Sequence, residues 1–150
     1  MKTLVRHIAL VVPDLRAAES FYQPVFGMEL IGREAVREDG LWYTLPFDKD
    51  WDDAVAAGIE LTMLALRKDG FVLALFKGDA SPGQVPFIGL AMPADDIGAV
   101  RARLPEEAQL LGSSPEYLEF RDPYGITWQV SAPGAEFRTT GDWAGRWLEL

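Results

Sequence analysis

The hydrophobic and polar positions of the chain predict strands and helices in alternation, beginning with a strand and a capped helix. Residues 4–12 are mostly apolar, as in a buried strand, and Pro13 interrupts the run. Asp14 stands where its carboxylate can cap a helix, and apolar side chains recur at helical spacing over residues 15–24. Gly27 follows as a stop signal, so the pattern predicts one strand and one helix before it.

The remainder of the first half predicts strands. Residues 28–38 indicate a strand with charges on one side. Residues 59–67 and 71–77 predict a hairpin between them, because the Asp69-Gly70 pair at their junction is a strong turn signal.

The second half repeats the same order. Residues 86–92 predict a strand, and residues 95–104 predict a helix. Three short strands are expected near residues 108–112, 116–121 and 126–131. A βαβββ pattern that occurs twice predicts an α+β protein built from two related modules.

The pattern also predicts how the chain divides. The first module is expected over residues 1–78 and the second over 84–132, with 133–150 as a C-terminal tail. Residues 39–58 have no counterpart in the second half, and they are rich in aromatic and acidic side chains. A short helix near residues 50–57 is expected within this insertion.

Composition and charge exclude several classes of partner. The 150 residues carry 14 basic and 23 acidic side chains, a formal charge of −9, so nucleic acid and anionic membranes are not expected partners. No apolar run is long enough for a transmembrane helix, and a charged N-terminus argues against a signal peptide. With no cysteine, disulfides and thiolate chemistry are excluded, and a cytoplasmic location is expected.

Three motifs in this order resemble the vicinal oxygen chelate superfamily, which includes glyoxalases, bleomycin-resistance proteins and extradiol dioxygenases. They are residues 7–15, residues 21–30 with Phe21-Tyr22 and Phe26-Gly27, and residues 120–125. The resemblance implies two βαβββ modules whose mixed sheet forms an open cup, often in a homodimer. It also implies four metal-ligand positions on the cup floor, which here are His7, Ala74, Phe87 and Gln129.

The residues at those four positions predict a degraded metal site. A catalytic divalent ion needs about three or more protein ligands, whereas Ala74 and Phe87 offer no lone pair. His7 is the only histidine, and the amide of Gln129 is a weak neutral ligand. Two carboxylates on strands expected to line the cup, Glu60 and Glu119, are the alternative source of ligands. The sequence thus favours no cofactor, with a divalent metal ion held by His7, Gln129, Glu60 and Glu119 as the alternative.

A cup without a metal can still bind a small organic molecule, because its predicted walls combine polar and aromatic side chains. In the last strand Thr127, Gln129 and Ser131 share one face, and in the strand before it Tyr117, Glu119 and Arg121 do. The candidate ligand-binding residues are His7, Trp42, Tyr43, Glu60, Phe87, Tyr117, Glu119, Arg121 and Gln129.

Several of these side chains also have structural interpretations. His7 is either a ligand contact or a core histidine, and Glu119 with Arg121 can form a surface pair. The tail residue Trp147 can dock the tail on the core or on a partner subunit.

The sequence therefore predicts a protein that binds a small organic ligand non-covalently, with drug sequestration as one form of that activity. The alternative is a metal-dependent lyase, isomerase or dioxygenase of the same superfamily, so enzymatic activity stays open. A third hypothesis is an interaction module that uses the exposed aromatics of the insertion and tail.

Overall fold

The computed structural model describes residues 3–79, 85–106, 108–121, 126–134 and 138–150. Its contacts divide the chain into two compact units. Unit 1 contains Met1–Leu10 and Gly83–Glu136, and unit 2 contains Val11–Pro82 and Phe137–Leu150. The first strand is therefore grouped with the second half of the sequence, and the C-terminal segment with the first half.

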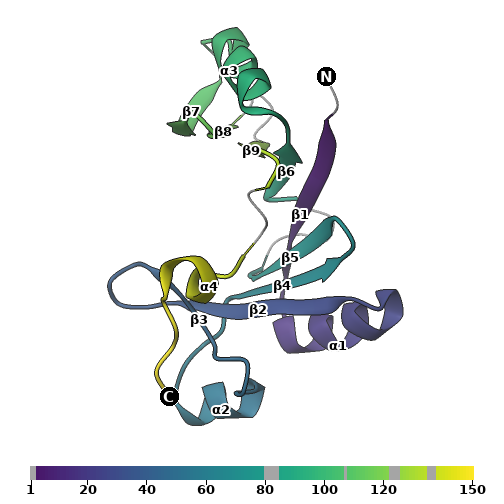
Figure 1. Cartoon of the computed structure of the whole chain (residues 1–150). Helices are drawn as coiled ribbons and strands as arrows, with labels where there is room; N and C mark the ends of the chain where they lie inside the picture. Colours follow the sequence, from purple (N-terminus) through teal and green to yellow (C-terminus); the bar gives the residue numbers. More distant parts are fainter. Residues whose placement is uncertain (1–2, 80–84, 107, 122–125, 135–137) are drawn as a thin grey trace. The chain divides into compact units, whose positions relative to one another are not determined.

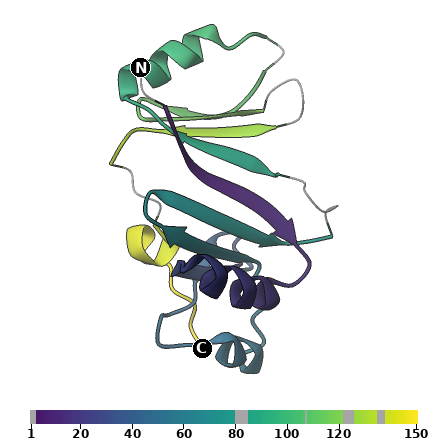
Figure 2. The ribbon, with the colours of Figure 1, turned by 90° about the vertical axis from the view of Figure 1, so that its right-hand side faces the viewer.

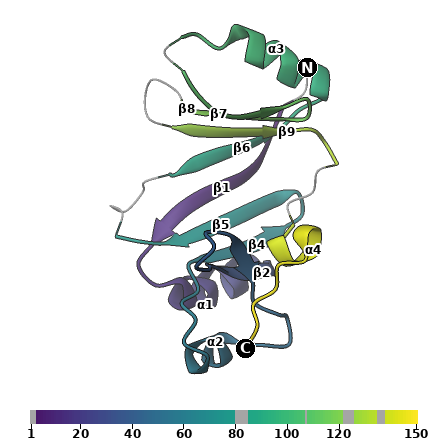
Figure 3. The same cartoon turned by 90° about the vertical axis from the view of Figure 1, so that its left-hand side faces the viewer.

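Unit 1 is a five-stranded sheet covered on one face by a helix (Figure 3). Its elements are β1 (Leu4–Val12, of which residues 4–10 belong to this unit), β6 (Phe87–Ala91), α3 (Ala94–Arg103), β7 (Gln109–Ser114), β8 (Tyr117–Arg121) and β9 (Thr127–Ser131). The strand order is β1-β6-β9-β8-β7, with β6 and β9 parallel and the other neighbours antiparallel. On the covered face, Ile97 of α3 packs with Leu118 and Val130 in a buried apolar cluster.

Unit 2 contains the antiparallel sheet β3-β2-β4-β5, which α1 covers (Figure 1). Its elements are α1 (Leu15–Phe26), β2 (Glu29–Val36), β3 (Trp42–Thr44), α2 (Trp51–Ala56), β4 (Met63–Lys68), β5 (Phe71–Lys77) and α4 (Thr140–Ala144). The last residues of the chain run beside α2, where Leu148 joins Ala54 in a buried cluster (Figure 2).

The C-terminal segment is held to unit 2 by a buried carboxylate. Glu34 of β2 accepts hydrogen bonds from the Thr44 hydroxyl and from both the backbone N–H and the hydroxyl of Thr140. The backbone of Thr44 also bonds to Arg146 and Leu148, so these tail residues extend along the edge strand β3. The predicted docking of the tail on the core is consistent with these contacts.

The α+β class predicted from the sequence is confirmed. The second half has the element order β6-α3-β7-β8-β9, and the first half has the same order with β3 and α2 inserted between β2 and β4. Asp14 caps α1 by accepting from the N–H of Ala17, and Gly27 ends the helix in the left-handed conformation at φ +62°. Strand β3 was not expected, because three residues give no periodicity to read.

The predicted hairpin between β4 and β5 forms with its turn at the expected residues, although the left-handed residue is Asp69, at φ +53°. Residues 122–125 of the third family motif lie outside the described part of the chain. Within that part, no helix is both long and apolar enough to cross a membrane. The module boundaries inferred from the sequence stay a prediction.

Candidate functional site

A row of paired residues crosses the sheet of unit 1. His7 of β1 pairs with Gly89 of β6, which pairs with Gln129 of β9. Gln129 pairs in turn with Glu119 of β8, and Glu119 with Gly112 of β7. Directly paired residues share a face of a sheet, and the neighbours of this row along β8 and β9 pack against α3. The row therefore lies on the face opposite α3, and we refer to these five residues as the transverse row.

Gly89 allows the imidazole of His7 to cross strand β6. A Cβ atom added to Gly89 would lie 1.9 Å from His7 Nδ1 and 2.0 Å from Cε1. The ring thus occupies the space that any side chain at position 89 would fill. This contact brings His7 Nε2 to 3.0 Å from the amide oxygen of Gln129, on the strand beyond.

A bulge in β1 adds a second side chain to the same face. The register shifts between Val5 and His7, so Arg6 is the extra residue. Its guanidinium donates to the hydroxyl of Ser131, which shares a strand face with Gln129. Two successive residues of β1 therefore both contact side chains of β9.

The polar side chains form a chain of hydrogen bonds that converges on Glu119. The Tyr117 hydroxyl donates to Glu119 Oε2, and Gln129 Nε2 donates to the same oxygen at 3.4 Å. An ionised carboxylate only accepts, so this contact fixes which way the amide of Gln129 points. The amide oxygen then faces His7, and His7 Nε2 must carry the proton that it donates.

Burial and hydrogen bonding set the protonation states of His7 and Tyr117, which lie at the two ends of this chain of hydrogen bonds. Burial lowers the pKa of His7 below its usual 6.5; the hydrogen bond with Gln129 opposes this shift, and the charge of Arg6 adds to it. Burial also raises the pKa of Tyr117, with the bond to Glu119 and the charge of that carboxylate acting in the same direction. At neutral pH the chain of bonds therefore holds a neutral imidazole and a protonated phenol.

The sole histidine makes this arrangement testable by NMR. We expect the imidazole nitrogens of His7 to show the neutral tautomer protonated at Nε2, with a pKa below 6.5. The Gln129→Leu variant should lower that pKa further, because it removes the contact that opposes the shift. An imidazole protonated at Nδ1, or a pKa above 6.5, would contradict the bonding pattern.

The same lowered pKa predicts a loss of stability in acid. The unfolded chain takes up a proton near pH 6.5 whereas the folded chain resists it, so the stability from His7 is complete above pH 6.5. It is lost as the pH falls from 6.5 toward the lower folded-state pKa. Comparison of unfolding free energies with His7→Gln, which cannot titrate, should show a shallower pH dependence in the variant.

The remaining predicted residues of unit 1 lie around the transverse row. Phe87 contacts His7 edge to face, with 5.7 Å between ring centres, and it pairs with Thr127. Arg121 is exposed at the end of β8, and the described partners of Glu119 are Tyr117 and Gln129.

The other predicted residues belong to unit 2 and have local partners there. Trp42 packs edge to face on Phe76, and the Tyr43 hydroxyl donates to Asp39. Glu60 forms an exposed ion pair with Lys77, and this pairing lowers the pKa of Glu60.

Two other predicted positions also lie in unit 2. Ala74 is fully buried opposite Ala65. Trp147 packs against Phe47.

Gly89 and Arg6 are two residues on this face that sequence reasoning did not identify. A glycine inside the apolar run Phe-Ile-Gly-Leu-Ala is a signal of close approach across a strand, and it could have indicated the first. Nothing local indicated the bulge that brings Arg6 to the same face.

The donors on this face do not fit a catalytic metal ion of the kind that the family resemblance implied. His7 Nε2 is directed at an amide oxygen, and its Nδ1 is packed on Gly89. Phe87 and Ala74 cannot ligate a metal. Within the described ranges, no group of three or more His, Cys, Asp or Glu side chains is arranged to hold a metal.

Comparisons with known proteins agree on the fold. The family model described as Glyoxalase/Bleomycin resistance protein/Dioxygenase superfamily matches residues 4–130. No curated protein matches the sequence.

Three solved structures illustrate the structural likeness. The 2,3-dioxygenase LapB from Pseudomonas sp. KL28 superimposes with a TM-score of 0.55 at 13% identity, covering 87% of this chain and 42% of that one. The Mn(II)-bound glyoxalase from Novosphingobium aromaticivorans superimposes with a TM-score of 0.53 at 20% identity, covering 90% of this chain and 40% of that one. A hypothetical protein from Bacillus halodurans C-125 superimposes with a TM-score of 0.53 at 12% identity, covering 93% of this chain and 100% of that one. This chain thus spans about two fifths of the dioxygenase and the glyoxalase, and identities this low establish the fold alone.

Proposed function

We propose that this chain, which belongs to the Glyoxalase/Bleomycin resistance protein/Dioxygenase superfamily, binds a small organic ligand non-covalently over the transverse row of unit 1. The binding serves sequestration or recognition of the ligand, and drug sequestration is one form of it. The ligand is held by hydrogen bonds and ring contacts, without a metal ion.

The hydrogen-bond chain that ends on Glu119 is the observation that carries this proposal. Both described contacts of the carboxylate engage Oε2, which leaves Oε1 to accept from a ligand. The carboxylate is half-buried, so a donor that reaches it meets less competition from water. Glu119 therefore favours a ligand that carries a hydrogen-bond donor or a positive charge.

The rings on the same face favour a flat or cationic ligand. Phe87 is half-buried beside His7, and Tyr117 is half-buried beside Glu119. A cation placed over such a ring gains about 0.5–2 kcal/mol. The formal charge of −9 adds a long-range attraction for a cation. A planar organic cation meets both preferences, for a flat shape and for a positive charge.

A ligand panel read by NMR tests the proposal. We expect planar organic cations to shift the imidazole signals of His7 saturably, and neutral molecules of the same shape to bind more weakly. Glu119→Gln should weaken binding of the cation by about tenfold or more, the usual loss for a hydrogen bond to a charged group. Glu116→Gln removes an exposed carboxylate just before β8 and should leave the affinity unchanged. If Glu119→Gln and Glu116→Gln bind the cation with equal affinity, Glu119 is not a contact of the ligand.

The alternative of a metal-dependent lyase, isomerase or dioxygenase rests on the row that places His7, Gln129 and Glu119 on one face of unit 1. Calorimetric titration with Mn²⁺ separates the two functions. We expect no stoichiometric binding by the natural chain, and measurable binding by the double variant Phe87→His with Gln129→Glu, which supplies the missing donors. Tight binding of one Mn²⁺ per natural chain would establish the alternative.

A further inference from the structure

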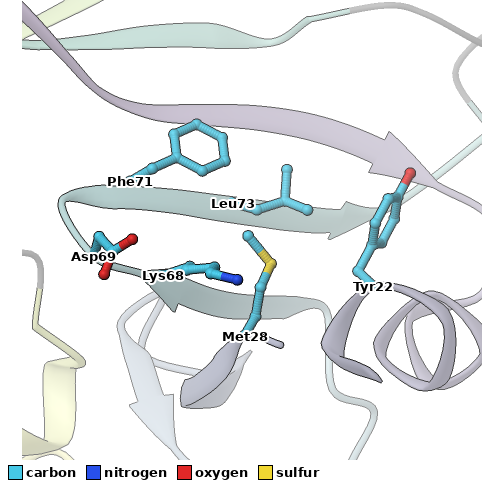
Figure 4. Close-up of a pocket in the computed structure, with 6 residues that line it drawn as sticks. All are labelled: Tyr22, Met28, Lys68, Asp69, Phe71 and Leu73. Atoms are coloured by element: carbon cyan, nitrogen blue, oxygen red, sulfur yellow. The ribbon is translucent and has the colours of Figure 1, made fainter. Parts of the chain in front are cut away.

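A cavity lies in unit 2, between the end of α1 and the tip of the β4–β5 hairpin (Figure 4). It has a volume of about 430 Å³, within the range of sites for small organic molecules. Its lining residues are Tyr22, Met28, Lys68, Asp69, Phe71 and Leu73. None of them belongs to the transverse row, so the cavity is a separate site.

The cavity exists because the hairpin extends past the start of the neighbouring strand. β2 begins at Glu29, which pairs with Arg67 of β4. The hairpin continues for one more pair, Lys68 with Phe71. At Gly27 the chain leaves α1 in the left-handed conformation, so α1 ends before it covers the hairpin tip.

The cavity combines an apolar interior with a cation. Met28 and Leu73 are buried in its floor, with 7% and 6% of their surface exposed, and Phe71 and Tyr22 form half-buried aromatic sides. Figure 4 shows the Lys68 ammonium extending toward Met28, whereas the Asp69 carboxylate lies at the far end of the turn.

The ammonium of Lys68 also lies near the C-terminal end of α1. Its Nζ atom is 3.6 Å from the position that a Cβ on Gly27 would take. An anion that enters the cavity therefore meets the charge of Lys68, and an apolar body meets the side chains behind it.

We propose that this cavity binds an organic anion with an apolar body, such as an aromatic or aliphatic carboxylate or sulfonate. The apolar body contacts Met28, Leu73 and Phe71, and the acidic group pairs with Lys68. The formal charge of −9 repels anions from the protein as a whole, so binding of an anion requires this local cation.

Anilinonaphthalene sulfonate tests the proposal, because its fluorescence rises in an apolar site and it carries one negative charge. We expect one saturable site per chain, from which decanoate displaces the probe. Lys68→Glu should weaken binding of the sulfonate by about tenfold or more. The same variant should change binding of the uncharged phenylnaphthylamine by less than about twofold, since only the apolar contacts serve that probe.

Two control variants distinguish binding at this cavity from a general effect of charge and from binding at unit 1. Lys49→Glu makes the same charge change elsewhere in unit 2 and should leave sulfonate binding unchanged. Glu119→Gln, which alters the ligand site proposed for unit 1, should also have no effect, so the two proposals fail independently. The cavity proposal is overturned if Lys68→Glu binds the sulfonate as the natural chain does, or if Lys49→Glu weakens binding equally.

Discussion

Replacement of Gly89 by alanine is expected to destabilise the protein by about 1–3 kcal/mol, the usual cost of forcing extra volume into a packed site. The new Cβ would lie 1.9 Å from His7 Nδ1, so the imidazole must move away from β6. Movement of the ring breaks the contact between its Nε2 and the amide oxygen of Gln129. Urea denaturation measures the change in unfolding free energy, and NMR of His7 reports the displaced ring.

The transverse row supplies its own control for this prediction. Gly112 stands at the far end of the row, and a Cβ there would meet its nearest neighbour at 3.4 Å, a tolerable contact. Gly112→Ala is therefore expected to be neutral or slightly stabilising, because alanine restricts the unfolded chain more than glycine.

A double mutant tests the cause of the Gly89 effect. In the double variant His7→Ala with Gly89→Ala, the ring that the new Cβ would strike is absent. The double variant should therefore lose less stability than the sum of the two single variants. Strictly additive effects would show that the imidazole does not cross β6 at this glycine.

Removal of the Glu19 carboxylate is expected to lower the free energy of unfolding by more than Gly89→Ala does, by about 3–5 kcal/mol. The change breaks a buried ion pair and leaves the charge of Arg33 without its partner. Arg33 of β2 donates to both oxygens of Glu19 in α1, with its Nε at 3.0 Å. The indole N–H of Trp51 in α2 donates to the same carboxylate, and the guanidinium lies 5.3 Å from the Trp51 ring centre. Glu19→Ala should thus loosen three elements of unit 2 together and lower the denaturation midpoint.

An exposed ion pair between the same two helices provides the comparison. Arg16 of α1 donates to Asp52 of α2 at 2.8 Å, but 54% and 76% of their side-chain surfaces are exposed. Arg16→Ala should leave the denaturation midpoint unchanged, because exposed pairs contribute little.

The double variant Glu19→Leu with Arg33→Met should recover much of the stability lost in Glu19→Ala, because it replaces both charges of the buried pair with apolar side chains. If Glu19→Ala unfolds at the same denaturant concentration as the natural chain, the buried pair is not a stabilising contact.

Local pattern and long-range pairing differ in how far the sequence predicts them. The cap at Asp14 and the stop at Gly27 depend on residues within one turn of the helix, and both were predictable. The partners of Glu19 lie 14 and 32 positions away, and no periodicity within α1 identifies them.

In the candidate site, too, the local pattern was predictable from the sequence and the long-range pairing was not. Alternation along β8 and β9 predicted that Glu119 and Gln129 each stand on a polar face of their strand. The register that places them opposite each other, and His7 opposite Gly89, is a property of pairing between distant strands. The bulge at Arg6 depends on that pairing as well, so the sequence pattern alone could not reveal it.

The exchange of terminal segments between the two units has a consequence for biosynthesis. Residues 11–82 leave the ribosome well before the segment 137–150 that completes their unit, and the first ten residues wait for the stretch 83–136. Unit 2 therefore cannot finish folding until the segment 137–150 has been made, because the buried Glu34 and Thr44 bond to Thr140 within it. Until Arg146 and Leu148 have been synthesised, the edge strand β3 lacks the backbone partners that they give to Thr44, so this edge is open to pairing with other chains.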